Sequence, residues 1–217
     1  MAGSTNGAQR ASHRSRIRLV VGLPLIVVLL GSLAAAPTVG ATTSSRVPNT
    51  SATTLTTTTI DRPWYSTELF YLGLVNCTRT GGWVLSDGTC RGYGSGHYSA
   101  YVRPLNLAAG ISTAVSRRYA KLLAVRGLCS HYADHDPGYR LRRAGYYRWT
   151  WGENVGCRDG YASPKAAVLA SHLYYQGEKA SNGGHWKNIK NATFLWVGIG
   201  IWRYGSRTRL VVDFYRP

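Results

Sequence analysis

A single carboxylate lies between two glycines in the segment Gly152-Glu153-Asn154-Val155-Gly156. Glycine allows a positive backbone φ or the close approach of another segment, so we interpret this segment as a turn that aims the Glu153 side chain. His131 upstream and His185 downstream lie in similarly polar, glycine-rich surroundings. A carboxylate beside imidazoles can support acid–base chemistry or metal binding. We therefore predict one cleft containing all three side chains, although a Gly-Glu-Asn triplet alone is more typical of an ordinary turn.

Other candidate groups for chemistry are few. His135 lies between two aspartates and is the alternative to His131, whereas His97 and His172 fit surface or packing positions. The chain contains no Gly-x-Ser-x-Gly motif of the kind that presents a serine nucleophile. The sequence therefore indicates a site made of histidine and glutamate.

Helical periodicity supplies the scaffold for this site. It is strongest in 105–127, where apolar residues recur every three or four positions, and Gly127 is a typical helix end. A first helix is predicted over 68–76 and a short one over 139–145, with arginines on its exposed side. Ser163-Pro164 combines a favoured N-cap with proline at the first helical position, which predicts a helix to about residue 175.

The C-terminal part of the chain changes from helical to strand character. Residues 193–204 and 207–215 are rich in β-branched and aromatic side chains, and Gly205-Ser206 between them predicts a β-hairpin. The segment 81–99 is rich in glycine and predicts a loop, and 176–190 is polar. Helices followed by a terminal hairpin indicate an α+β fold in which helices pack on a small antiparallel sheet.

The N-terminal segment has the features of an export signal. Arginines precede an apolar run from Leu19 to Ala36, and small residues follow up to Ala41, which predicts a cleaved signal peptide over 1–41. The run is also long enough to span a bilayer, so an uncleaved signal anchor is the alternative. Residues 42–63 are rich in Thr and Ser and predict a flexible linker before a folded domain over 64–217. We expect this domain to be secreted or anchored to the outer face of the membrane.

An even number of cysteines in an exported chain predicts disulfides. The chain has four cysteines, Cys77, Cys90, Cys129 and Cys157. No two of them have the Cys-x-x-Cys spacing, so a zinc ribbon is not indicated. Four cysteines can form two disulfides in three different ways. We favour Cys77–Cys90, which would close a short glycine-containing loop, and Cys129–Cys157, which would link the segments of a candidate histidine and the candidate glutamate. This pairing would leave no thiol nucleophile.

The chain is strongly basic, with 26 Lys and Arg against 9 Asp and Glu and a formal net charge of +17. This charge favours anionic surroundings, although a solvated basic surface without a dedicated partner is the alternative. Arg140, Arg142 and Arg143 form the one tight basic group of the domain, and no nucleic-acid motif is present. We expect an anionic cell-wall polymer or lipid as partner, with membrane contact only through an uncleaved N-terminal segment.

From Glu68 to the C-terminus, several motifs occur in a recognisable order. They are a helix ending in Gly127-Leu-Cys-Ser-His131, Tyr139-Arg-Leu-Arg-Arg-Ala-Gly-Tyr146, Gly152-Glu-Asn-Val155, Ser163-Pro164 before an Ala/Val helix, Gly184-His-Trp-Lys-Asn-Ile189, and Val197-Gly-Ile-Gly200 before a final strand. In order and spacing they resemble the CAP superfamily of cysteine-rich secretory proteins, antigen 5 and pathogenesis-related type 1 proteins, and most closely its bacterial members. Its domain is also called the SCP domain.

The resemblance implies an α-β-α sandwich with a central antiparallel sheet and a cleft that contains two histidines and two glutamates. In this sequence they are His131, Glu153, Glu178 and His185. Two neutral imidazoles can hold Zn²⁺ or another divalent metal, and Glu153 could act as general base on a bound water. The same four groups can also form a hydrogen-bond network without catalysis.

Two functions follow from this interpretation. The first is an exported binding module for a metal, lipid or cell-wall ligand at the cell surface. The alternative is a metal-dependent hydrolase of peptide or a wall component, with His131 and His185 as metal ligands and Glu153 as base. A purely structural exported domain is the third possibility, so whether the protein is an enzyme stays open at this stage.

Overall fold

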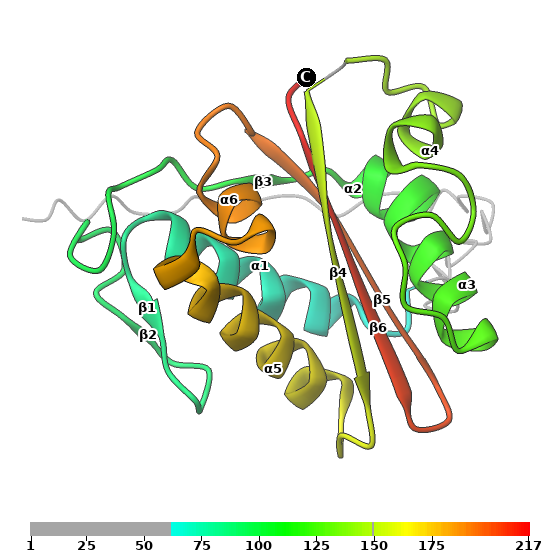
Figure 1. Ribbon diagram of the computed structural model, residues 1–217, viewed down its shortest axis with the longest axis horizontal. Helices are drawn as coiled ribbons and strands as arrows, with labels where there is room; N and C mark the ends of the chain where they lie inside the picture. Colours follow the sequence, from blue (N-terminus) through cyan, green and yellow to red (C-terminus); the bar gives the residue numbers. More distant parts are fainter. Residues whose placement is uncertain (1–61, 149) are drawn as a thin grey trace, which may run out of the picture. The chain divides into compact units, whose positions relative to one another are not determined.

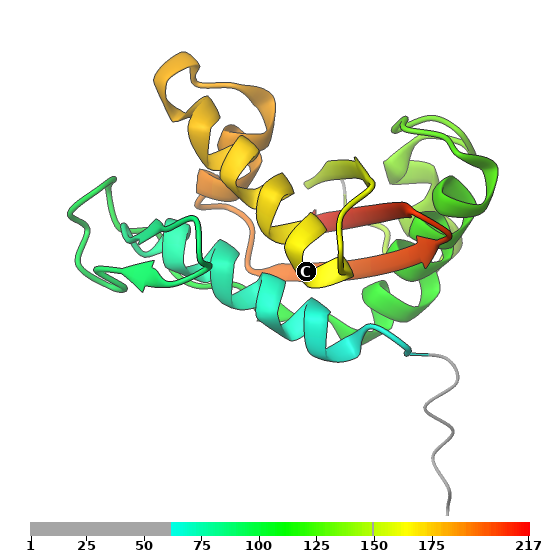
Figure 2. The same cartoon turned by 90° about the horizontal axis from the view of Figure 1, so that it is seen from below.

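Two groups of helices cover opposite faces of a sheet in the computed structural model, which describes residues 62–148 and 150–217 (Figure 1). One group contains α1 (Tyr65–Arg79), α5 (Pro164–Gly177) and α6 (Gly184–Lys190); the other contains α2 (Ala109–Ile111), the π-helical turn η2 (Ser112–Ser116), α3 (Arg117–Arg126) and α4 (Pro137–Arg143). The view from below separates these layers (Figure 2). The predicted signal, and the linker up to residue 61, lie outside the described residues. None of the helices within the described ranges is long and apolar enough to cross a membrane.

The central sheet has the strand order β3-β5-β6-β4. Its strands are β3 (Asn106–Leu107), β4 (Trp151–Asp159), β5 (Trp196–Tyr204) and β6 (Arg207–Tyr215). The three long strands are antiparallel, and the short β3 adds to β5 in parallel. β5 and β6 form the predicted hairpin. The α+β prediction of an α-β-α sandwich is therefore confirmed, with one short parallel strand added.

The side chains of β6 alternate between the two helical layers. Leu210, Val212 and Phe214 belong to the core beneath α1 and α5, whereas Val211 packs toward α3. Asp213 is on the α3 side and is fully buried. A strand buried on both faces reads as a continuous apolar run, and this aspartate interrupts the run.

The segment predicted as a turn around Glu153 is in fact the first half of β4. Neither Gly152 nor Gly156 has a positive φ. A Cβ on Gly152 would lie 2.7 Å from Asn188 Oδ1, and one on Gly156 would lie 2.6 Å from Ser171 Oγ. The glycines therefore serve close packing of α6 and α5 on the strand, and the turn prediction was wrong because both uses of glycine look alike in sequence.

A second close approach joins β5 to the helical segment on the other face. A Cβ on Gly200 would overlap the backbone of Ser116, and one on Gly198 would overlap Ile111. At the start of η2, Ser112 Oγ accepts the hydrogen bond of the Ile199 amide at 2.9 Å. The predicted helix over 105–127 is consequently divided into β3, α2, η2 and α3.

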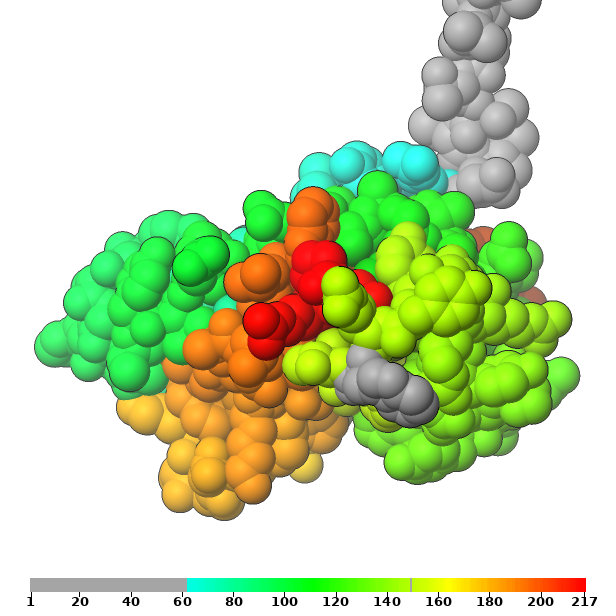
Figure 3. Space-filling model, turned by 90° about the horizontal axis from the view of Figure 1, so that it is seen from above, coloured from blue at the N-terminus to red at the C-terminus, as the bar shows by residue number. Residues whose placement is uncertain are grey.

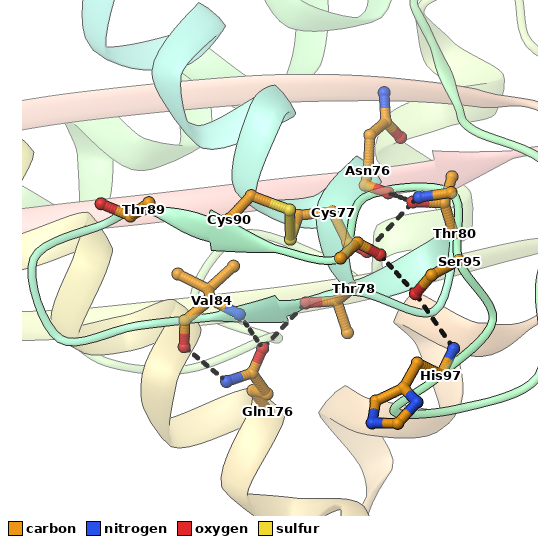
Figure 4. Close-up of a disulfide and its surroundings, with 12 residues drawn as sticks. Asn76, Cys77, Thr78, Thr80, Val84, Thr89, Cys90, Ser95, His97 and Gln176 are labelled. Carbon is orange, nitrogen blue, oxygen red and sulfur yellow. Dashed lines mark hydrogen bonds between the residues drawn. A yellow bond between two sulfur atoms is a disulfide. The ribbon is translucent and has the colours of Figure 1, made fainter.

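Both predicted disulfides are present, Cys77–Cys90 and Cys129–Cys157. Figure 4 shows the first, which joins α1 to a two-stranded hairpin formed by β1 (Trp83–Val84) and β2 (Cys90–Arg91). On its other side, the Gln176 amide of α5 donates to Val84 O at 3.0 Å and accepts from Val84 N at 2.9 Å. The predicted loop over 81–99 thus contains this small hairpin.

Other predicted helices are present with shifted limits. α1 and α5 extend beyond their predicted ends, α4 begins two residues early at Pro137, and Gly127 ends α3 with a φ of 68°. Ser163 caps α5 by accepting from the Ala166 amide at 3.1 Å. α6 was missed, because 176–190 shows little apolar periodicity.

The C-terminal residues emerge beside the orange segment that links α6 to β5 (Figure 3).

A buried arginine and a half-buried lysine hold α6 against the end of α1. The fully buried Arg79 donates to four backbone carbonyls, among them Ile189 O at 2.6 Å and Phe194 O at 3.0 Å. Burial lowers the pKa of Arg79 to about 10. Lys190 donates to Arg79 O at 2.8 Å and Ala100 O at 2.7 Å. These contacts position the short helix that carries His185.

Candidate functional site

The first histidine–glutamate pair is His131 with Glu153. His131 follows α3, and its Nδ1 lies 2.7 Å from Glu153 Oε1. The histidine side chain is 39% exposed, whereas the glutamate side chain is 1% exposed. The imidazole therefore faces solvent and the carboxylate lies beneath it.

Arg140 of α4 completes this pair from the protein interior. Its Nη2 donates to Glu153 Oε2, and its Nη1 donates to the backbone oxygens of His131, Asp134 and His135 at 3.0, 3.2 and 2.6 Å. The predicted position of this arginine on an exposed helix face was wrong, because Arg140 is buried. A buried carboxylate requires a charged, hydrogen-bonding partner, and Arg140 provides it.

The loop that carries His131 is held at two further points. Tyr119 of α3 donates its hydroxyl to Ser130 O at 2.7 Å and accepts from the Ala133 amide at 3.0 Å. The Arg140 guanidinium lies 3.5 Å from the centre of the Tyr119 ring. The disulfide Cys129–Cys157 links the same loop to β4. His131 is thus positioned from α3, α4 and β4.

The second pair is His185 with Glu178. Glu178 begins a 3-10 turn, η3 (Glu178–Ser181), and its Oε1 lies 2.7 Å from His185 Nδ1. Its Oε2 accepts from the His185 amide at 3.0 Å. Burial raises the pKa of Glu178, but the hydrogen bond and charge of His185, with the amides at the start of α6, outweigh it and place this pKa below its ordinary value. A Cβ on Gly183 would lie 2.5 Å from Glu178 Oε2, so a larger residue there would displace the Glu178 side chain.

Two tyrosines of α5 flank the second imidazole. Tyr175 is stacked on His185 with ring centres 4.3 Å apart, and Tyr174 meets the same ring edge-on at 5.9 Å. Burial raises the pKa of Tyr175, and the negative charges of both Glu178 and Glu153 raise it further. Tyr175 therefore covers one face of the His185 ring.

Asparagines connect the second pair to β4. The Asn154 amide donates to His185 O at 3.1 Å. The Asn188 amide donates to Glu153 O at 3.1 Å and to Asn154 Oδ1 at 2.8 Å. Successive residues of a strand point to opposite faces, so Glu153 meets the His131 loop while Asn154 meets α6. One strand thereby carries partners of both histidines.

A further carboxyl group lies beneath Glu153. Asp213 of β6 is directly opposite Glu153 in the antiparallel pairing and accepts from Ser116 Oγ at 2.6 Å. Burial raises the pKa of Asp213 well above its ordinary value, and the Glu153 charge raises it further. This residue was not identified from sequence, although an aspartate inside an apolar strand is a visible signal.

The other three histidines of the described residues are separate from these pairs. His135 has a positive φ of 59° and lies 3.8 Å from Asp134 at an exposed position. His172 is buried, contacts Thr78 Oγ1 at 2.9 Å, and has its pKa lowered to about 3 by burial. His97 is exposed. The structure therefore brings His131, and not His135, to Glu153.

One ring nitrogen of each paired histidine remains without a bonding partner in the described part of the chain. Each imidazole uses Nδ1 for its carboxylate, and the Nε2 atoms of His131 and His185 have no partner within the described ranges. Bonding one ring nitrogen to a carboxylate is how proteins orient metal-binding histidines. However, among residues 62–148 and 150–217 no group of three or more His, Cys, Asp or Glu side chains is arranged to hold a metal ion. The donor set thus fits at most two protein ligands.

No protein-family model matches the sequence, and the search of curated proteins found no match. Among solved structures, an extracellular protein containing an SCP domain from Bacillus anthracis strain Ames is similar over 70% of this chain and 41% of its own, with 19% identity and a TM-score of 0.50. The fold is that of an SCP domain.

This chain thus spans less than half the length of that extracellular protein. Two further structures show weaker similarity. NaASP2 with Zn²⁺ is similar over 68% of this chain and 78% of its own, with 14% identity and a TM-score of 0.46. Na-ASP-1 is similar over 69% of this chain and 38% of its own, with 14% identity and a TM-score of 0.45. The comparison with the bacterial protein therefore supports the fold predicted from the motif order.

Proposed function

We propose that this chain is an exported binding module of the CAP superfamily, with the two histidine–glutamate pairs as its ligand site. The observation that carries the proposal is the environment of Glu153. Both of its oxygens bond to protein groups, and its side chain is 1% exposed. A carboxylate in this state orients His131. The groups left to meet a ligand are the Nε2 atoms of His131 and His185.

The ligand chemistry that suits these atoms is a divalent cation. Neutral imidazole is a good ligand for Zn²⁺, and each ring is held by a carboxylate as metal-binding histidines are. Catalytic zinc sites have three protein ligands, so two imidazoles favour an exchangeable ion that keeps several positions for water or for ligand oxygens. Such an ion would supply positive charge to an anionic ligand.

The setting that we propose is the outer surface of the cell. Disulfides persist in oxidising compartments, and this domain has two. The large excess of positive charge favours an acidic wall polymer or anionic lipid as the surrounding partner. Secretion and surface anchoring both agree with this proposal.

The hydrolase alternative requires a carboxylate oxygen that faces a substrate or its attacking water. Glu153 has a protein partner on each oxygen, and both oxygens of Glu178 also accept hydrogen bonds. The binding module is therefore the better-supported function.

Zinc titration calorimetry on the full-length, oxidised chain tests the proposal. We expect one saturable site, and the double variant His131→Ala/His185→Ala should weaken binding by about tenfold or more, because it removes both ring ligands. His97→Ala is the matched control, since it removes an exposed histidine outside the site.

Zinc binding that is equal in the wild type and the double variant would contradict the proposal, and so would the absence of binding by the folded wild type. A Glu153→Gln variant distinguishes the alternative, because a hydrolase would lose turnover whereas a binding module would change only in affinity.

A further inference from the structure

A cavity of about 350 Å³ lies between α3 and α4, and two residues of its wall, Tyr119 and Arg140, also support the His131–Glu153 pair. Its volume is at the lower end of the range for small-molecule sites. None of the four histidine–glutamate residues lines it. It is therefore a candidate site distinct from the proposed metal site.

The cavity wall carries an excess of positive charge. Three arginines line it, Arg118, Arg140 and Arg143, against one acidic residue, Asp134. Arg118 and Arg143 are exposed, and within the described ranges neither side chain has a hydrogen bond, ion pair or ring contact. Asp134 is half exposed and lies 3.8 Å from His135, which also lines the cavity. Two guanidinium groups are thus available to an anion.

Arg140 supplies an independent observation. Its side chain is 7% exposed, and both terminal nitrogens have acceptors, but its buried Nε has none in the described part of the chain. Buried donors are nearly always satisfied, so an orphan in a cavity wall requires an explanation. A bound anion would place negative charge beside this buried guanidinium, which lacks one of its acceptors.

The rest of the wall is apolar. Ala114, Val115, Leu122 and Ala144 contribute small aliphatic surfaces, and Tyr139 packs its ring against His135 with centres 4.2 Å apart. An inorganic ion alone would leave this surface without contacts. The lining therefore suits a charged head attached to a compact apolar body.

We infer that the α3–α4 cavity binds a small organic anion, with its carboxylate or phosphate head between Arg118 and Arg143 and its apolar part on Ala114 and Leu122. Arginine is suited to this role because its planar fork donates two parallel hydrogen bonds to carboxylate or phosphate oxygens. This inference is independent of the proposed metal site.

Benzoate and phenyl phosphate, titrated separately into the full-length oxidised chain by calorimetry, test the inference. We expect saturable binding of at least one of them, weakened about tenfold or more in Arg118→Gln/Arg143→Gln because both charge-assisted contacts are removed. The matched control is Arg103→Gln/Arg126→Gln, which removes the same charge from two exposed arginines that do not line the cavity.

The stronger of the two probes identifies the preferred head group. Absence of binding of both probes would overturn the inference, as would equal weakening in the control, which would indicate a general charge effect. Zinc titration of the Arg118/Arg143 variant keeps the two proposals separate, because those side chains make no contact with His131 or His185.

Discussion

The two histidine–glutamate pairs have the same hydrogen bond and different supports. Glu153 is 1% exposed, and its partners His131 and Arg140 are 22 and 13 residues away in sequence. Glu178 is 16% exposed and bonds to His185 only seven residues further on. The first pair thus depends on the assembled tertiary structure, whereas the second is a feature of one local segment.

This difference in burial indicates which pair contributes more to the stability of the fold. Removing the partner of a buried charge leaves that charge unpaired, which is far more costly than losing a partly exposed contact. The first pair should therefore be coupled to global unfolding, while the second should tolerate change. The following substitutions test this contrast.

The largest effect is expected for Arg140→Met, which keeps the aliphatic length but removes the charge beside Glu153. It also frees three carbonyls of the His131 loop. We expect the free energy of unfolding to fall by about 3–5 kcal/mol, measured by urea denaturation. The control Arg143→Met alters an exposed arginine of the same helix and should stay within about 0.5 kcal/mol. Equal losses in both would contradict the special role of Arg140.

The two disulfides should differ in how much they stabilise the fold. Cys77–Cys90 closes a separation of 13 residues and Cys129–Cys157 one of 28. Replacing the first pair by serine should cost about 3 kcal/mol, and replacing the second about 0.7 kcal/mol more, because the longer loop constrains the unfolded chain more strongly.

Because Cys129–Cys157 anchors the His131 loop, its removal should also weaken zinc binding, while removal of Cys77–Cys90 should leave zinc affinity unchanged. Denaturation and calorimetry on the two double variants check both statements. A larger stability loss from the shorter loop would show that strain or residual structure outweighs chain entropy.

The smallest effect is expected for Glu178→Gln. A lowered folded-state pKa means that Glu178 stabilises the fold above its unfolded pKa and that this contribution is lost as the pH falls through the folded value. The variant should be less stable by about 0.5–1 kcal/mol at pH 7, and the difference should begin to shrink once the pH falls below the ordinary glutamate pKa of about 4.3.

Urea midpoints at pH 7, 5 and 3 give the measurement, and Asp134→Asn is the exposed control. A difference that persists unchanged at pH 3 would show that the charge of Glu178 is not its source.

The helical half of the fold was predictable from local signals. Gly127 ends α3 because glycine readily adopts a left-handed φ, and Ser163 begins α5 because its hydroxyl caps the helix N-terminus. Both properties belong to the single residue. The terminal hairpin was predictable from its turn and its β-branched strands. The candidate residues His131, Glu153, Glu178 and His185 were named from motif order, and the structure pairs them two by two; their role in a cleft stays a prediction.

Other features could not be predicted because their cause lies in a distant segment. Gly152 and Gly156 indicated a turn, yet they are strand residues that admit Asn188 and Ser171. Arg140 belonged to a cluster of arginines expected on a solvent-exposed face, and only the position of Glu153 on the neighbouring strand explains its burial. A short polar helix such as α6 likewise depends on cations that reach it from α1 and from its own end.

By itself the sequence determined the local conformation of most helices, the hairpin and the chemical types available for a site, because backbone preferences and side-chain chemistry belong to single residues and short windows. Only the tertiary structure decided which charges are buried, which glycines are contacts and which carboxylate meets which histidine. Those outcomes depend on burial and on distances between segments far apart in the chain, where packing and desolvation outweigh local preference.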